Sequence, residues 1–292
     1  MGFLSMLFGG KQLSPEEEQQ EQEQKKFDLL KYDGVKAMKI GQADYAVRCF
    51  TEALKMRDDL EIHDYLSQVL LRQGELDAAM EELQTLGSAE PENVEIQIRV
   101  AQVAYMQEDY AAMVAACQQA MTLAPENPEP YFLNAQALKG QQNPVGAIAM
   151  LTKAITLKED YAEAYLLRAQ TLLAMGDTAS AETDADWLLE HVGDHEDVLL
   201  LKARIVAAKG QPQDAIAVYD KVIEVNPFQI DAFRERGRLR LDLGDKAGAE
   251  QDMQTVLELD PQQLADVSGE YSAEGIEQRV KQAYSAVNPL GL

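Results

Sequence analysis

Small residues recur along this chain at steps of 33 or 34 residues, and this regularity constrains the fold more than any other feature of the sequence. Three further series keep the same phase: a second row of small residues, a row of turn residues that is mostly glycine, and a row of closing residues that is often proline. Self-similarity at such a period is typical of stacked repeats. The first series is Ala46, Ala79, Met113, Ala147, Ala181, Ala215 and Ala249.

Each repeat has the pattern of two helices joined by a tight turn. A glycine such as Gly41 supplies the left-handed conformation that ends the first helix, and a proline such as Pro125 ends the second. Large apolar residues recur between them at helical spacing, as Tyr219 and Val222 do in the sixth repeat. One such hairpin cannot bury its own apolar face, so we expect neighbouring repeats to stack around one continuous core.

These features resemble the tetratricopeptide repeat family. The resemblance is carried by the small residue at the eighth place, the glycine turn, the alanine at the twentieth place, the closing proline, and the aromatic residues at the fourth place: Tyr131, Tyr165 and Phe233. It implies an all-α fold, a right-handed α-solenoid superhelix of about seven helix-turn-helix repeats whose first helices line a concave groove. The departures from the family pattern are His63, Gln97, Met113 and Pro144.

The repeat frame divides the chain into four parts. We expect an apolar segment at 1–13, a Gln/Glu-rich leader or helix extension at 14–26, repeats over 27–263, and a linker with a capping helix at 273–287 within 264–292. Ser14, Pro15 and Glu17 have the spacing of a capping box, but the tract after them has no apolar stripe, so both interpretations of 14–26 stay open. The predicted repeats are 27–59, 60–93, 94–127, 128–161, 162–195, 196–229 and 230–263.

The charge balance disfavours several classes of partner. The chain has 26 Lys and Arg against 50 Asp and Glu, which opposes binding to a nucleic-acid backbone or a polybasic attachment to lipid. No apolar run approaches the roughly 20 residues of a transmembrane helix. His191 and His195 have a metal-ligand spacing, but Gly193 interrupts any helix between them. We therefore expect no enzymatic activity, no cofactor and no metal.

The predicted groove has a distinctive composition. The resemblance implies that the second, fifth and ninth places of each first helix face it. Apolar side chains at the fifth place and glutamines at the ninth suit an extended peptide, because the apolar groups give burial and the amides pair with backbone donors and acceptors. Burial between adjacent first helices is the alternative for the apolar residues. The candidates are Ile98, Gln102, Phe132, Gln136, Leu166, Gln170 and Leu200.

Arginines gather at the C-terminal end of this groove. Helical spacing places Arg234 and Arg238 on one face of the seventh repeat, beside Arg204 at the ninth place of the sixth. Guanidinium groups bind carboxylates and phosphates through paired hydrogen bonds, so this end is predicted to receive an acidic side chain, a chain terminus or a phosphorylated residue. The alternative is a structural network of the arginines with the nearby acids Asp197, Asp231, Glu235 and Asp242.

The sequence thus predicts a cytoplasmic scaffold that binds a protein or peptide partner in its groove. The alternative is a subunit of an assembly, formed by self-association or by tethering to a membrane. Trp187, the single tryptophan, falls at a place that is usually exposed in this family, although partial burial under a neighbouring side chain is equally open. A short apolar cluster could dock on a partner or on a membrane surface. That cluster is Phe3, Leu4, Leu7 and Phe8.

Overall fold

The computed structural model of the protein describes residues 14–260, and these form fourteen α-helices and no β-strand. The predicted capping helix at 273–287 and the apolar segment at 1–13 lie outside the described residues. The helices are α1 Pro15–Lys39, α2 Ala43–Met56, α3 Leu60–Gln73, α4 Leu76–Ala89, α5 Val94–Met106, α6 Tyr110–Leu123, α7 Glu129–Gly140, α8 Pro144–Leu157, α9 Ala162–Ala174, α10 Thr178–His191, α11 Glu196–Ala208, α12 Pro212–Val225, α13 Ile230–Asp242 and α14 Lys246–Leu259.

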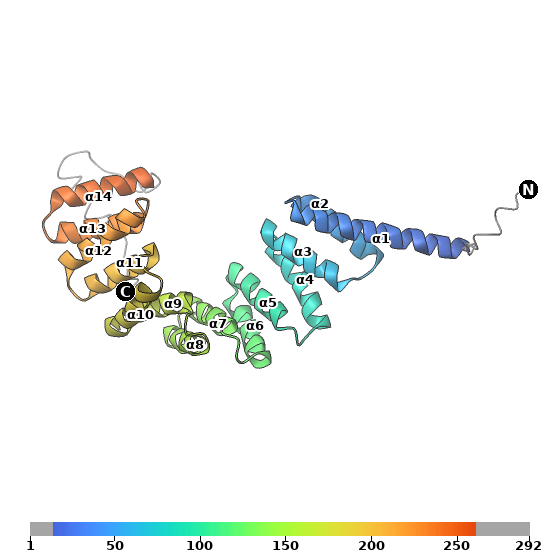
Figure 1. The fold of residues 1–292 in the computed structure, drawn as a ribbon, viewed down its shortest axis with the longest axis horizontal. Coiled ribbons are helices and arrows are strands. Elements are labelled where there is room, and N and C mark those ends of the chain that lie inside the picture. Colours follow the sequence, from blue (N-terminus) through green and yellow to red (C-terminus); the bar gives the residue numbers. More distant parts are fainter. Residues whose placement is uncertain (1–13, 261–292) are drawn as a thin grey trace, which may run out of the picture. The chain divides into compact units, whose positions relative to one another are not determined.

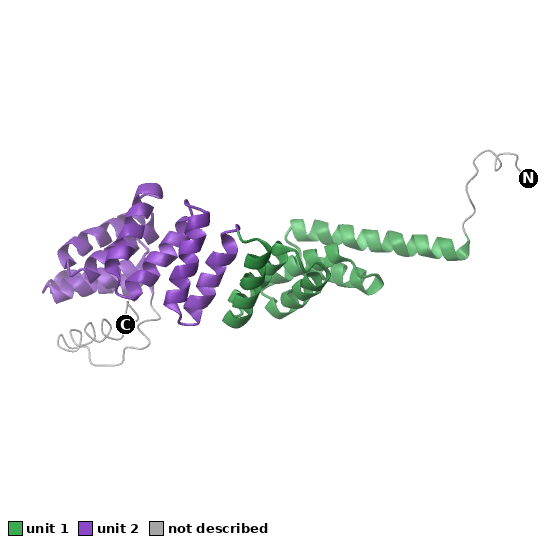
Figure 2. Cartoon of the chain, turned by 90° about the horizontal axis from the view of Figure 1, so that it is seen from below, with its two compact units in different colours: residues 1–125 green, residues 126–292 purple. Residues whose placement is uncertain are grey.

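Consecutive helices pack as hairpins, and neighbouring hairpins stack within α1–α6 and within α7–α14 (Figure 1). The all-α solenoid predicted from the sequence is therefore confirmed. The chain divides into two compact units, residues 1–125 with α1–α6 and residues 126–292 with α7–α14 (Figure 2). We call them unit 1 and unit 2. The repeat spacing favours one continuous core, whereas in the structure each unit contains core clusters of its own.

Left-handed residues follow the first helix in all seven hairpins of residues 14–260, at the places that the turn series predicts. Gly74, for example, caps α3 with φ of 78°. In two hairpins a residue with a side chain takes this conformation: Glu108 with φ of 57° and Gln142 with φ of 59°. Pro144, which departs from the family pattern, lies at the start of α8, where a missing backbone N–H costs no hydrogen bond. The turn geometry thus persists where the glycine is replaced.

Helix α1 is longer than the other helices because its capping box begins it at Pro15. The Ser14 hydroxyl accepts a hydrogen bond from the Glu17 backbone N–H at 3.2 Å, and the Glu17 carboxylate accepts one from the Ser14 N–H at 2.7 Å. The tract 15–26 is therefore a helical extension that is continuous with the first helix of the array. In both views this helix projects beyond the rest of unit 1 (Figures 1 and 2).

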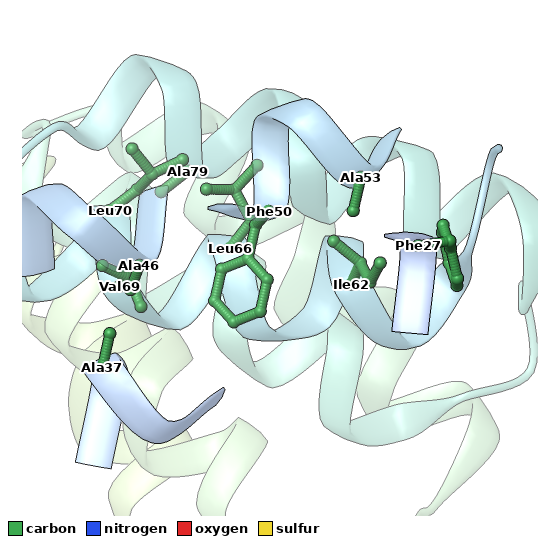
Figure 3. Close-up of a cluster of buried hydrophobic side chains, with 10 residues drawn as sticks. All are labelled: Phe27, Ala37, Ala46, Phe50, Ala53, Ile62, Leu66, Val69, Leu70 and Ala79. Atoms are coloured by element: carbon green, nitrogen blue, oxygen red, sulfur yellow. The ribbon is translucent and has the colours of Figure 1, made fainter. Parts of the chain in front are cut away.

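The core of unit 1 is apolar and tightly packed around Phe50 (Figure 3). Phe50 is fully buried, and burial of such a ring stabilises a fold by roughly 1.5–3 kcal/mol. Gly34 on α1 lies so close that a Cβ there would be 2.5 Å from Cε1 of the Phe50 ring. Glycine is therefore required at this place because the helix backbone rests directly on an aromatic ring.

Unit 2 combines apolar clusters with buried ion pairs between helices. Arg168 on α9 binds the buried Asp184 on α10 with two hydrogen bonds of 2.8 and 2.7 Å. Arg236 on α13 binds the buried Asp252 on α14 in the same way, and it also binds Asp220 on α12 at 2.6 Å. These pairs join the two helices of a hairpin and, through Asp220, successive hairpins.

Candidate functional site

The structure places the predicted groove residues in different environments. Ile98 in unit 1 and Leu200 in unit 2 are buried, which matches the alternative of burial between first helices. Phe132 and Leu166 are only half-buried, and the Phe132 ring lies 5.1 Å from that of Tyr161. Among the glutamines, Gln102 is exposed, whereas Gln136 and Gln170 are half-buried. The apolar residues therefore divide between core and accessible surface.

A first cavity in unit 2 brings three of the candidates together. It has a volume of about 300 Å³ and lies among α9, α11 and the start of α13. Gln170, Leu200 and Arg204 line it, together with the carboxylates of Asp197 and Asp231. We call it cavity A. It offers an amide, an apolar wall and two acids within one hollow.

A second cavity of about 240 Å³ lies among α11, α12 and α13, and we call it cavity B. Arg204 and Arg238 both line it, with the Leu239 side chain and two alanines as its apolar part. Tyr219, Glu235 and Asp242 complete the wall. Arg204 lines both cavities, so the two are neighbours along the first helices of unit 2.

Arg204 is held in place by acids of α13. Its Nε and Nη2 atoms donate to the Glu235 carboxylate at 3.0 and 2.6 Å, and Nη2 also donates to Asp231 at 3.1 Å. Burial by itself lowers the pKa of Arg204, but the hydrogen bonds and charges of these acids outweigh burial and raise it. The Tyr219 hydroxyl donates to Glu235 at 2.6 Å, and burial followed by the Glu235 charge raises the tyrosine pKa. Arg204 thus stays charged as part of the wall.

The other two arginines of the predicted cluster differ from each other. Arg234 donates to Asp231 at 2.6 Å and is half-buried. Arg238 is exposed, and among residues 14–260 it makes no hydrogen bond or ion pair. Arg236 and Arg240 both bind Asp252, as expected of structural residues. Of the three arginines predicted to converge, only Arg238 therefore has a guanidinium group without an acid of its own.

Trp187 is half-buried and is stacked between two other aromatic rings. The ring centroids of Tyr165 and His191 lie 3.8 and 4.2 Å from that of Trp187, each with an interplanar angle of 11°. Two parallel rings so close must occupy opposite faces of the indole, so neither face is open to a partner. His191 also donates from Nδ1 to the Trp187 carbonyl oxygen at 2.8 Å, and His195 caps α11. Residues 14–260 contain no cluster of metal-ligating side chains.

Sequence reasoning did not assign Tyr219 and Gln229 to the site, and it treated Glu235 only as a neutralising acid. One signal was available for Glu235. It stands at the sixth place of its repeat, where the three preceding repeats have Leu133, Leu167 and Leu201. An acid at a place that is otherwise apolar indicates a buried carboxylate that needs a cationic partner. Gln229 precedes α13, and no repeat pattern distinguishes it.

Comparisons with known proteins agree with this architecture. A sequence model of the tetratricopeptide repeat matches residues 201–268, and a model of the ETO1 C-terminal domain matches residues 20–210. A tetratricopeptide repeat protein from Parabacteroides merdae has a TM-score of 0.69 at 17% identity, over 89% of this chain and 99% of that one. No curated protein sequence matches the chain.

Two further solved structures have the same fold. PilW, described as a type IV pilus biogenesis factor, has a TM-score of 0.63 at 18% identity, over 75% of this chain and 98% of its own. YrrB, described as having an unusual peptide-binding site, has a TM-score of 0.51 at 14% identity, over 61% of this chain and 92% of its own. Within residues 14–260 no helix is long and apolar enough to span a membrane.

Proposed function

We propose, because this chain belongs to the tetratricopeptide repeat family, that it is a non-catalytic protein-interaction scaffold whose binding surface lies on the first helices of unit 2. The observation that carries the proposal is the pair of neighbouring cavities A and B, which share Arg204 in their walls. Together the two cavities hold an amide, apolar surface and Arg238, a cation that has no acid of its own among residues 14–260. These are groups that can contact an extended protein segment. The occupant is a segment of a partner protein.

Cavity A would hold the main chain of that segment. The Gln170 amide can donate to a carbonyl and accept from an N–H, so it can pair with an extended backbone whatever its sequence. Leu200 and Leu173 supply apolar wall for one side chain of the partner. Asp197 and Asp231 lie at the same cavity, so a neutral or basic side chain is favoured there.

Cavity B would hold an anionic group of the partner: an acidic side chain, a C-terminal carboxylate or a phosphorylated residue. The Arg204 and Arg234 guanidinium groups already bind Glu235 and Asp231. Arg238 lines the cavity and is exposed, so its fork of N–H groups is available to a carboxylate or phosphate. In this proposal Arg204 and Arg234 shape the site, and Arg238 makes the charged contact.

The test begins with photo-crosslinking in cells. A photoreactive benzoylphenylalanine replaces Gln170 in one protein and, as control, the exposed Lys221 on α12 in another. We expect one partner segment to be captured from position 170 and not from position 221. Equal capture from both positions, or no capture from position 170, would contradict the proposed surface.

The captured segment, made as a labelled peptide, then tests the cation. Arg238→Glu is expected to weaken binding at least about tenfold in fluorescence anisotropy, because it replaces a bidentate donor by a like charge. The matched control is Arg72→Glu, which makes the same charge change at an exposed arginine of unit 1. Arg238→Lys should restore only part of the affinity. Equal affinities for wild type and Arg238→Glu would remove Arg238 from the site.

A further inference from the structure

Helix α1 carries an exposed apolar strip that the proposed function does not use. Phe27, Gly34 and Ala37 form its buried side. On the opposite side Leu29, Tyr32 and Ile40 follow helical spacing, and they are 59%, 65% and 61% exposed. We call this opposite side the outer α1 face. Large apolar side chains gathered on one helix face mark a surface that another helix can cover.

Charged residues occupy the rest of this face in a definite order. The face begins with the acids Glu18 and Glu21 and ends with the bases Lys36 and Lys39, with Lys25 before the apolar strip. All five are exposed. The single ion pair among them in the structure joins Lys25 to Glu21 at 2.6 Å within the same helix. The outer α1 face is thus acidic at its start, apolar at Leu29 and Tyr32 near its middle, and basic at Lys36 and Lys39, with Ile40 directly after the last base.

We propose that the outer α1 faces of two copies of this chain pair antiparallel, which makes the protein a reversible dimer. One register pairs the acids of this face with its bases. With the two-fold axis between positions 28 and 29, Glu18 lies opposite the partner's Lys39, and Glu21 lies opposite the partner's Lys36. Lys25 then meets the partner's Tyr32, whose ring face attracts a cation. A two-fold axis repeats each contact, so the surface is self-complementary.

The antiparallel direction follows from the same charges. A parallel pair would place each Glu against Glu and each Lys against Lys, and it would align the two helix dipoles unfavourably. The charges therefore set direction and register, while burial of Leu29 and Tyr32 supplies most of the attraction.

The size of the contact predicts its strength. Residues 18–40 span roughly 33 Å of helix at about 1.5 Å per residue. A single pair of helices of that length buries less than about 1,200 Å² in total, which is the range of weak, transient complexes. The dimer should therefore dissociate on dilution, with a dissociation constant on the order of micromolar.

Sedimentation velocity of the full chain, from about 1 to about 300 μM, is the first measurement. Two charge-reversed proteins accompany it: Lys36→Glu with Lys39→Glu, and Glu18→Lys with Glu21→Lys. Each is expected to self-associate at least about tenfold more weakly than wild type, because like charges then face each other. Mixed together they should form a heterodimer, since each acidic face meets a basic one. Recovery on mixing separates a specific contact from a folding defect.

A symmetric crosslink tests the register. Leu29→Cys should give a disulfide-linked dimer on mild oxidation, since the two copies of this residue lie beside the axis, offset by only about 1.5 Å along the helices. Gln20→Cys is the control, because Gln20 is exposed elsewhere on the same helix, and the native Cys49 and Cys117 are buried. A wild-type monomer at every concentration would overturn the proposal, including the case where residues 1–13 cover the face. A dimer that is insensitive to both charge reversals, or equal crosslinking at both positions, would also overturn it.

Discussion

The two units build the same repeat but stabilise one place in it differently. At the seventh place of their first helices, repeats two and three in unit 1 have Leu66 and Val100, which are apolar. The corresponding places in repeats five to seven of unit 2 are basic: Arg168, Lys202 and Arg236. Each of these binds carboxylates on second helices, and Asp184 and Asp252 are buried in doing so.

This difference shows that a repeat frame fixes where a side chain lies, not which force acts there. A leucine at the seventh place gains stability from burial and tolerates change in proportion to the volume that is lost. A buried ion pair at the same place is expensive to desolvate and stabilises only while both partners are present. Unit 2 should therefore respond more sharply than unit 1 to the loss of a single charge.

The largest effect is expected from Asp252→Ala in unit 2. Asp252 is 1% exposed and binds both Arg236 and Arg240, so its loss leaves two cations without their buried partner. We expect the free energy of unfolding to fall by roughly 3–5 kcal/mol in urea titrations. The control is Asp220→Ala, whose carboxylate binds the same arginine but is 46% exposed, with an expected loss below about 1 kcal/mol. Equal losses of unfolding free energy for the two variants would contradict the proposed difference between the units, because burial of the carboxylate would then have no effect.

The next effect should come from Gly34→Ala in unit 1, where packing rather than charge is decisive. The new methyl group would overlap the Phe50 ring, which is fully buried, so the ring or the helix backbone would have to shift. Overpacking of this kind costs about 1–3 kcal/mol. Gly87→Ala is the matched control on α4, because its Cβ would meet its nearest neighbours at 3.7 Å. That variant should be neutral or more stable, by up to about 1 kcal/mol. The melting temperatures of both variants, compared with that of the wild type, test these two expectations.

The smallest effect is a pH dependence in unit 1, where His63 provides one charge contact between helices. Its ring binds Glu82 on α4 and Asp58. Burial lowers the pKa of His63, but the bonds to both carboxylates outweigh burial and raise it above the ordinary value of about 6.5. The stabilisation is therefore complete below that ordinary value and is lost as the pH rises through the higher folded pKa.

The measurement compares wild type with His63→Gln between about pH 6 and about pH 9. The difference in unfolding free energy should be largest at the acid end and should shrink as the pH rises. In a Glu82→Gln background the same comparison should give a weaker pH dependence. A difference that grows with pH would show that the imidazole is stabilised in its neutral form instead.

The helices were predictable because their signals are local. Ser14 and Glu17 lie three residues apart, and the left-handed turn lies at a fixed place in each repeat. Short-range geometry is therefore enough to predict where the helices begin and end. Even Glu108 and Gln142, which replace the turn glycine, could be located from the period alone. The division into two units has no such signal, because the spacing of 34 continues unchanged past Pro125.

The partners of the arginines at the site were less predictable. Arg168 and Arg236 bind acids 16 residues later, on the second helix of their own hairpin. Arg204 instead binds acids 27 and 31 residues later, on the first helix of the next hairpin. All of these acids were visible in the sequence. Which of them an arginine reaches depends on its own place in the repeat and on how closely successive first helices approach, and only the packed structure specifies that distance.

The stack of Tyr165, Trp187 and His191 has a practical consequence. Trp187 is the single tryptophan of the chain, and both rings against it belong to unit 2. Tryptophan emission excited at long wavelength therefore reports unit 2 alone, whereas the helical circular dichroism signal reports both units. Melting curves from the two signals will coincide if the array unfolds as one cooperative body, and they will separate if the units unfold in succession. The protein thus carries an intrinsic optical probe of its own cooperativity.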